Sequence, residues 1–95
     1  MRASQTEVYL NWINSLEDRV ARARIQVRVD RLIHGNPGKH RNLPGGISEL
    51  KIDFGPGYRV YYTQRGSDLI VLLARGDKST QAHDIAAATA LAANL

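Results

Sequence analysis

The chain has 95 residues and no cysteine, and its 13 lysines and arginines outnumber nine aspartates and glutamates, so its formal charge is +4. A chain of this length has room for one modest core, and we expect residues 1–95 to form a single domain. The lack of cysteine excludes disulfides, thiolate nucleophiles and zinc–thiolate sites. No apolar run approaches the roughly 20 residues that span a bilayer. Because the polar start MRASQTE also does not resemble a signal peptide, we expect a cytoplasmic protein without membrane association.

The positive charge is carried mainly by arginine, with ten arginines and three lysines. A basic excess of this kind favours polyanionic partners such as RNA, DNA or acidic protein segments. The planar guanidinium group is suited to bidentate contacts with phosphate and carboxylate.

Two helices are expected before residue 35. Ser4 and Glu7 have the spacing of a capping box, which predicts a short first helix. The segment SLED at 15–18 predicts the start of a longer helix that runs to about His34 and ends at the GNPG sequence. The apolar residues of this second helix recur at helical spacing and form a broad stripe: Val20, Ala21, Ala23, Ile25, Val27, Val29 and Leu32.

The second half of the chain changes to a period of two, which is typical of strands. We expect a polar loop over 35–46, strands over 47–54 and 58–63, and a central strand over 69–74 that is apolar throughout and therefore covered on both faces. An alanine-rich helix follows from about Ser79. The predicted fold is α+β: an N-terminal helical hairpin, an antiparallel sheet of three to four strands and a C-terminal helix.

The turn Gly-Pro-Gly at 55–57 predicts the register of the hairpin around it. If this turn alone joins the strands, Asp53 lies opposite Arg59 and Lys51 opposite Tyr61. The four side chains then form a polar cluster on an exposed sheet face. A solvated face with one salt bridge explains this pattern, and so does a phosphate-binding patch held by rigid strands.

The segment ARGDKSTQAHD at 74–84 favours the phosphate-binding interpretation. It joins the central strand to the last helix, so Arg75 and Lys78 lie where free backbone N–H groups also attract an anion. Asp77 and Ser79 are expected to cap the helix.

These segments together resemble the RelE/ParE toxin superfamily, particularly its HigB-like branch of addiction module killer proteins. The resemblance runs through WINSLEDRVARARIQVRVDRLIHGNPG, ISELKIDFGPGYRVYY and LLARGDKSTQAHDIAAA, and so spans nearly the whole chain. It implies a toxin of a type II toxin–antitoxin pair with the RelE-like fold. Such toxins are typically ribosome-dependent endoribonucleases in which a ribose 2′-hydroxyl attacks its own 3′-phosphate.

The resemblance also implies roles for three cations. Arg59 matches the residue that stabilises charge on the phosphate, Lys78 would support the same charge, and Lys51 would be the base if neighbouring cations make its amine easier to deprotonate. RelE has a tyrosine near its C-terminus that is absent here. Tyr61 is a candidate replacement or a packing residue, and His83 is a candidate acid or base or an inert helix residue.

Three further arginines, Arg24, Arg28 and Arg31, recur along one face of the second helix. They would form a solvated stripe, or would bind ribosomal RNA or an acidic antitoxin segment. Arg75 is either an added phosphate contact or a local departure from the family pattern. His34 and His40 lack metal-ligand spacing, so we expect no metal and no other cofactor.

The partners implied are the ribosome, mRNA and a cognate antitoxin, expected to be a HigA-like helix-turn-helix protein. Two other functions fit the same resemblance. One is ParE-like inhibition of gyrase by binding alone, and the other is a degenerate module that only co-represses its operon. The cationic cluster favours the nuclease, because a protein that only binds need not gather charge on one sheet face.

Overall fold

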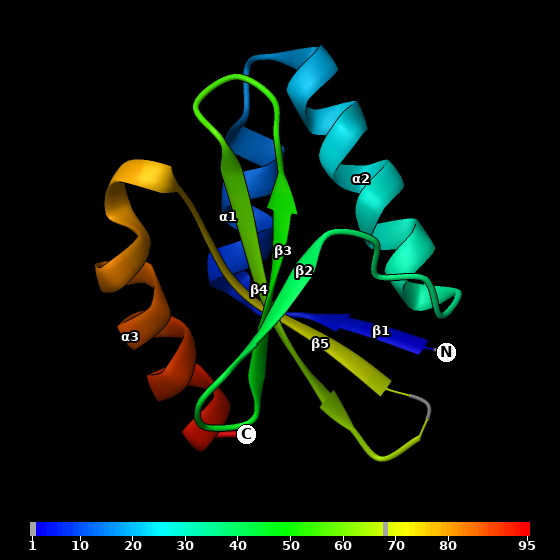
Figure 1. Ribbon diagram of the computed structural model, residues 1–95, viewed down its shortest axis with the longest axis vertical. Helices are drawn as coiled ribbons and strands as arrows, with labels where there is room; N and C mark the ends of the chain where they lie inside the picture. Colours follow the sequence, from blue (N-terminus) through cyan, green and yellow to red (C-terminus); the bar gives the residue numbers. More distant parts are fainter. Residues whose placement is uncertain (1, 68) are drawn as a thin grey trace.

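The computed structural model describes residues 2–67 and 69–95, which form one layer of β-sheet between helices (Figure 1). The elements in chain order are β1 (Arg2–Gln5), α1 (Glu7–Ser15), α2 (Arg19–Ile33), β2 (His40–Leu43), β3 (Ile47–Ile52), β4 (Tyr58–Arg65), β5 (Leu69–Asp77), the 3₁₀ turn η1 (Lys78–Thr80) and α3 (Gln81–Ala93). The α+β class, the two N-terminal helices and the C-terminal helix are confirmed. No helix within the described residues is long and apolar enough to cross a membrane.

The sheet has five strands in the order β1-β5-β4-β3-β2, so the predicted number of three to four is wrong. All pairs are antiparallel except that of β1 with β5, in which Arg2 aligns with Leu69. Both missed strands are short edge strands with mainly exposed, polar side chains. Such strands are held by backbone hydrogen bonds and carry no apolar alternation for a sequence pattern to reveal.

Helices cover both faces of the sheet, with α1 and α2 on one side and α3 on the other (Figure 1). The first face packs Ile25 and Val29 of α2 against strand residues that include Leu50, Val60 and Leu72. The second face packs Ala88 of α3 against strand residues of its own. β5 contributes to both cores, which confirms that it is covered on both sides.

The first helix begins later than its sequence predicted. Thr6, not Ser4, is the N-cap of α1, and its side chain accepts a hydrogen bond from the backbone N–H of Tyr9. Ser4 belongs to β1 and aligns with Val71. The pairing with β5 extends the chain through residue 5 and so moves the start of the helix.

The β3–β4 hairpin has a different register from the one predicted. Lys51 is paired directly with Arg59, and Glu49 with Tyr61. The connection takes five residues, because the strands stop at Ile52 and Tyr58, and Gly55 and Gly57 within it adopt positive φ. A shift of two residues keeps every side chain on its predicted face but brings the lysine and the arginine opposite each other.

Candidate functional site

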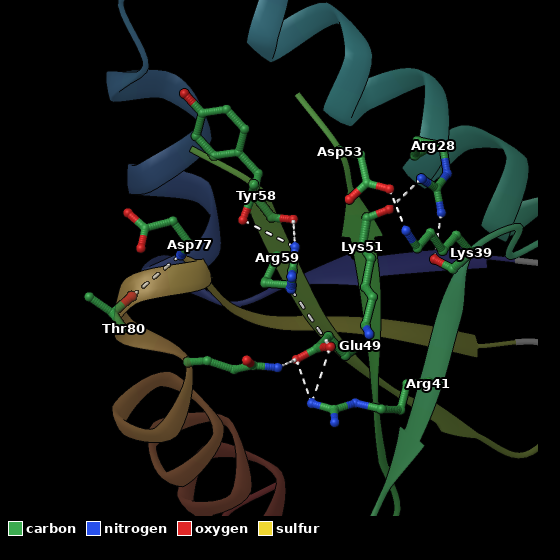
Figure 2. Close-up of polar contacts among 12 residues, drawn as sticks. Arg28, Lys39, Arg41, Glu49, Lys51, Asp53, Tyr58, Arg59, Asp77 and Thr80 are labelled. Atoms are coloured by element: carbon green, nitrogen blue, oxygen red, sulfur yellow. Dashed lines mark hydrogen bonds and ion pairs between the residues drawn. The ribbon is translucent and has the colours of Figure 1, made fainter. Parts of the chain in front are cut away.

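The three cations implied as catalytic lie around the β3–β4 turn. Lys51 and Arg59 extend from paired positions on the same side of the sheet (Figure 2). Lys78, the first residue of η1, lies beside Gly57. A β-carbon at Gly57 would lie 3.6 Å from both the Arg59 Nη1 atom and the Lys78 Cβ atom. Both residues therefore lie beside Gly57, and the reason that glycine is favoured at this position is its φ of +80°.

A pocket of about 310 Å³ opens at this turn. Arg59 and Lys78 line it together with the turn residues Asp53, Phe54, Gly55, Pro56 and Gly57. Lys78 is exposed and Lys51 is half-buried, and neither amine makes an ion pair or hydrogen bond within the described part of the chain. The Lys78 amine and the Arg59 guanidinium thus lie at one small concavity, an arrangement suited to an anion such as phosphate, while Lys51 is paired with Arg59 but does not line this pocket.

The face that carries these cations is not exposed, contrary to the expectation from the alternating pattern. Arg59 is only 7% exposed, and the facing Glu49 and Tyr61 are fully buried. The reason is α3, which covers this face with small side chains such as Ala88 and Ala92. The prediction that Lys51, Asp53, Arg59 and Tyr61 form a polar cluster on an exposed face is therefore wrong.

The buried carboxylate of Glu49 organises the site from below (Figure 2). One of its oxygens lies 3.8 Å from the Nε atom of Arg59 and 3.3 Å from an Nη atom of Arg41. The other accepts a hydrogen bond of 2.9 Å from the amide of Gln81. Glu49 therefore ties β2, β4 and the start of α3 together.

The guanidinium of Arg59 is also fixed from the turn side. Its Nη1 atom donates to the carbonyl oxygens of Gly57 and Tyr58, each at 3.2 Å. A side chain held at both ends is preorganised, which favours the binding of charge that develops in a transition state. Arg59 is consequently both a site residue and a structural one.

The end of β5 is shaped by a second buried carboxylate, Asp84, which accepts a hydrogen bond from Thr80 and lies 3.7 Å from the guanidinium of Arg75. A β-carbon at Gly76 would lie 1.7 Å from an Asp84 oxygen, so only glycine fits there. Arg75 is thus engaged by an acid and lines neither pocket described here. Asp77 caps the 3₁₀ turn η1 through the Ser79 backbone N–H, whereas Ser79 does not cap α3, whose N-cap is Thr80.

Neither candidate proton donor reaches the pocket. Tyr61 is packed beneath α3, where burial, followed by the negative charge of Glu49, raises the pKa of its hydroxyl. This is the packing role that the sequence left open. His83 is exposed on α3 and lines neither pocket.

The three arginines of α2 line one groove but differ in their contacts. Arg28 donates to the backbone oxygens of Lys51, Pro37 and Lys39, so it holds the chain before β2 against β3. Arg24 lies over the ring of Phe54 at 4.6 Å. Arg31 is exposed.

The lowered pKa of the Asp53 carboxyl reflects the local excess of positive charge. Its hydrogen bond from Lys39 holds the pKa of this carboxyl below the usual range, and the charges of Arg59 and Lys51 lower the pKa further. Among the described residues, no group of three or more histidines and carboxylates is gathered to hold a metal ion.

Sequence reasoning missed Glu49, Arg41, Gln81 and Asp84 as parts of the site. One signal for this was present in the sequence of the last helix. Its alanines form an apolar surface, and a surface of this kind is buried in the fold by packing against a face of the sheet. That face is the one that carries Glu49, so this glutamate had to be buried and paired.

Comparison with known proteins places this arrangement in a family. The chain is 43% identical over 90 residues to an uncharacterized protein of Haemophilus influenzae, an alignment that covers 95% of this chain and 91% of the relative. The chain belongs to the same family as that protein. No family model matches the chain, and no solved structure matches it significantly.

Proposed function

We propose that the protein is the toxin of a type II toxin–antitoxin pair and cuts mRNA on the ribosome. The observation that carries the proposal is that Arg59 and Lys78 line one pocket at the β3–β4 turn, with Lys51 paired to Arg59 on the neighbouring strand. These are the positions that the resemblance to RelE-type toxins singles out. Their partners in the proposed activity are the ribosome and mRNA, with a HigA-like antitoxin as the regulator.

In the proposed reaction the ribose 2′-hydroxyl attacks the adjacent 3′-phosphate. The bond from phosphorus to the 5′-oxygen breaks, leaving a 2′,3′-cyclic phosphate upstream and a 5′-hydroxyl downstream. Lys51 is proposed as the base that takes the 2′-hydroxyl proton. Arg59 and Lys78 stabilise the negative charge that grows on the phosphate oxygens. The leaving 5′-oxygen takes its proton from water, since neither candidate acid is placed to supply it: Tyr61 is buried, and His83 lines neither of the two pockets described.

The fixed position of the Arg59 guanidinium favours a catalytic role over a role in binding alone. Its contacts with Glu49 and with the turn carbonyls fix the guanidinium before substrate arrives. Preorganised charge is the largest contribution to many enzymatic rate enhancements, whereas phosphate contacts that only position a nucleic acid can be made by mobile surface side chains.

Induced expression in a bacterial host tests the proposal. We expect growth arrest and cleavage of translated mRNA from the wild-type chain, and loss of both in Lys78→Ala. Because Lys78 is exposed, this variant should keep its stability within about 0.5 kcal/mol. Arg65→Ala, which removes one exposed charge at the end of β4 opposite to the turn, is the matched control and should remain toxic.

Two other outcomes of this experiment would indicate a different function. DNA damage with intact mRNA would indicate a gyrase inhibitor of the ParE type. Normal growth with soluble, folded protein would indicate a co-repressor without toxicity.

A further inference from the structure

The two cations that line the pocket at the β3–β4 turn are held in different ways. Arg59 belongs to the middle strand of the sheet, is 7% exposed, and is fixed by Glu49 and by two turn carbonyls. Lys78 is exposed and directly follows β5, at the point where the sheet ends. The distance between the two charges therefore depends on the contacts that hold the short turn η1.

The start of this turn is fixed by the sheet and by its own side chains. The ladder between β4 and β5 pairs Arg59 with Gly76. Beyond it, the Thr80 hydroxyl accepts a hydrogen bond of 3.3 Å from the Asp77 backbone N–H and donates one to the buried carboxylate of Asp84. These last two bonds shape the turn but do not join it to the groups that hold Arg59.

The end of the turn is joined to Arg59 through Gln81. This residue is the first of α3 and comes directly after η1. Its amide donates a hydrogen bond of 2.9 Å to one oxygen of Glu49, and the other oxygen of Glu49 lies 3.8 Å from the Arg59 Nε atom (Figure 2). Glu49 is fully buried, and hydrogen bonds to a charged acceptor are among the strong ones. Lys78 therefore lies in a three-residue turn with both ends fixed relative to Arg59.

An amide is well suited to this position. Glu49 already faces two guanidinium groups, those of Arg59 and Arg41. A lysine at position 81 would compete with Arg59 for the same carboxylate, and an acid would repel that carboxylate. The glutamine amide donates a hydrogen bond without adding charge. Gln81 can therefore hold the end of the turn and leave the charge of Glu49 to the arginines.

We propose that Gln81 is a positioning residue for the proposed cleavage, and that through Glu49 it fixes Lys78 at the distance from Arg59 at which both cations contact one phosphate. The inference rests on the proposed function for its substrate. Gln81 lines neither of the two pockets described, so it acts through the cations and not on the RNA. A misplacement of about 1 Å in a catalytic site can lower a rate about 100-fold.

The fold itself should tolerate the loss of this hydrogen bond. The packing of α3 on the sheet is made further along the helix, by Ala88 and Ala92. Without the bond to Glu49, the first turn of α3 and η1 are loosened, whereas the helix stays docked. The expected defect is therefore in the placement of Lys78 and not in the folding of the chain.

The substitution Gln81→Met tests the inference, because methionine has a similar length but no amide donor. Gln64→Met is the matched control: Gln64 is exposed near the other end of β4, and its amide donates to the backbone oxygen of Gly66. The first measurement is the rate of mRNA cleavage at increasing ribosome concentration. The second is a titration with inorganic phosphate, followed by the NMR signals of the Gly57 and Lys78 backbone amides. Urea denaturation gives the folded fraction of each variant.

We expect Gln81→Met to cleave at least about tenfold more slowly at saturating ribosome concentration, with a half-saturating concentration within about twofold of wild type. It should bind inorganic phosphate about fivefold more weakly, because the two cations no longer face one anion together. Gln64→Met should match wild type in both measurements. A residue that supported only the fold would change the urea midpoint but not the rate per folded molecule.

The inference is overturned if, per folded molecule, Gln81→Met equals wild type in either activity that wild type shows. A wild-type chain that does not cleave mRNA would refute the proposed nuclease, and the phosphate titration would then decide on Gln81 alone. A wild-type chain that neither cleaves nor binds phosphate would overturn both. If Gln81→Met does not fold, Gln81→Ala, which is favourable in a helix, replaces it in both measurements.

Discussion

Glu49 shows how a single buried charge can decide what a surface-like sequence pattern becomes. In the sequence it alternates with apolar residues as a solvent-facing glutamate does, yet in the structure it is fully buried beside two arginines and a glutamine. Its partners come from β2, β4 and α3, which are far apart along the chain. Local periodicity therefore predicts its face of the sheet but not its surroundings.

We expect Glu49→Gln to destabilise the protein by about 3 kcal/mol, because it leaves the buried Arg59 without a counter-charge. Urea denaturation measures this loss. Glu17→Gln, at an exposed position before α2, is the control and should change the free energy of unfolding by less than about 0.5 kcal/mol. Equal urea midpoints for wild type and Glu49→Gln would show that the ion pairs do not support the fold.

At the scale of elements, β1 and β2 mark the limit of sequence prediction. The long helix α2 and strands β3, β4 and β5 were predicted close to their observed positions, because each has several apolar residues at one period. β1 and β2 have four mainly polar residues each and exist because a neighbouring strand offers backbone partners. Pairing of this kind is tertiary and leaves no local pattern.

The junction of β1 and α1 depends on Thr6. Its hydroxyl donates to the Leu73 carbonyl at 2.5 Å and accepts from the Tyr9 backbone N–H, and its own N–H donates to Leu72. We expect Thr6→Val to lower the free energy of unfolding by about 1–3 kcal/mol, through loss of the cap and of the bond to β5.

Thermal or urea denaturation monitored by circular dichroism measures this effect. The matched control is Thr89→Val on α3, where the hydroxyl is exposed and bonds only to its own helix, at Ile85. The control should stay within about 0.5 kcal/mol of wild type. If the two variants lose the same stability, the junction does not anchor α1.

At the scale of the whole molecule, the covering of both sheet faces explains the main errors and the main success. The continuous apolar run of β5 correctly predicted helices on both sides. Because helices cover both sides of the sheet, β3 and β4 have no fully exposed face. The alternation of polar and apolar residues in these two strands had instead predicted an exposed polar face. Lys51 and Arg59 still lie on one face, because the two-residue change of register preserves the faces of both strands.

Burial of tyrosines in this double-layered core makes stability sensitive to alkaline pH. Burial raises the pKa of Tyr9 to about 12, above the value of about 10 expected in the unfolded chain. The neutral hydroxyl is therefore favoured in the folded state, so its contribution is complete below pH 10 and is lost as the pH rises through 12. Burial raises the pKa values of Tyr61 and Tyr62 as well, which acts in the same direction.

We expect the free energy of unfolding to fall between about pH 10 and pH 12, and Tyr9→Phe to reduce that fall by about 2–3 kcal/mol. Denaturant titrations at several pH values measure the slope. The difference between variant and wild type at pH 8 is the reference, since Tyr9 is neutral there in both states. A variant with the wild-type alkaline slope would contradict the raised pKa.

If the cations at the β3–β4 turn cut RNA, as we propose, the products of the reaction identify the chemistry. The most direct measurement incubates the purified chain with ribosomes carrying an mRNA and analyses the ends of the fragments. We expect cleavage that requires the ribosome, an upstream fragment ending in a 2′,3′-cyclic phosphate, and no cleavage by Lys78→Ala. Intact mRNA with folded wild-type protein, or equal cleavage by Lys78→Ala, would contradict the proposal.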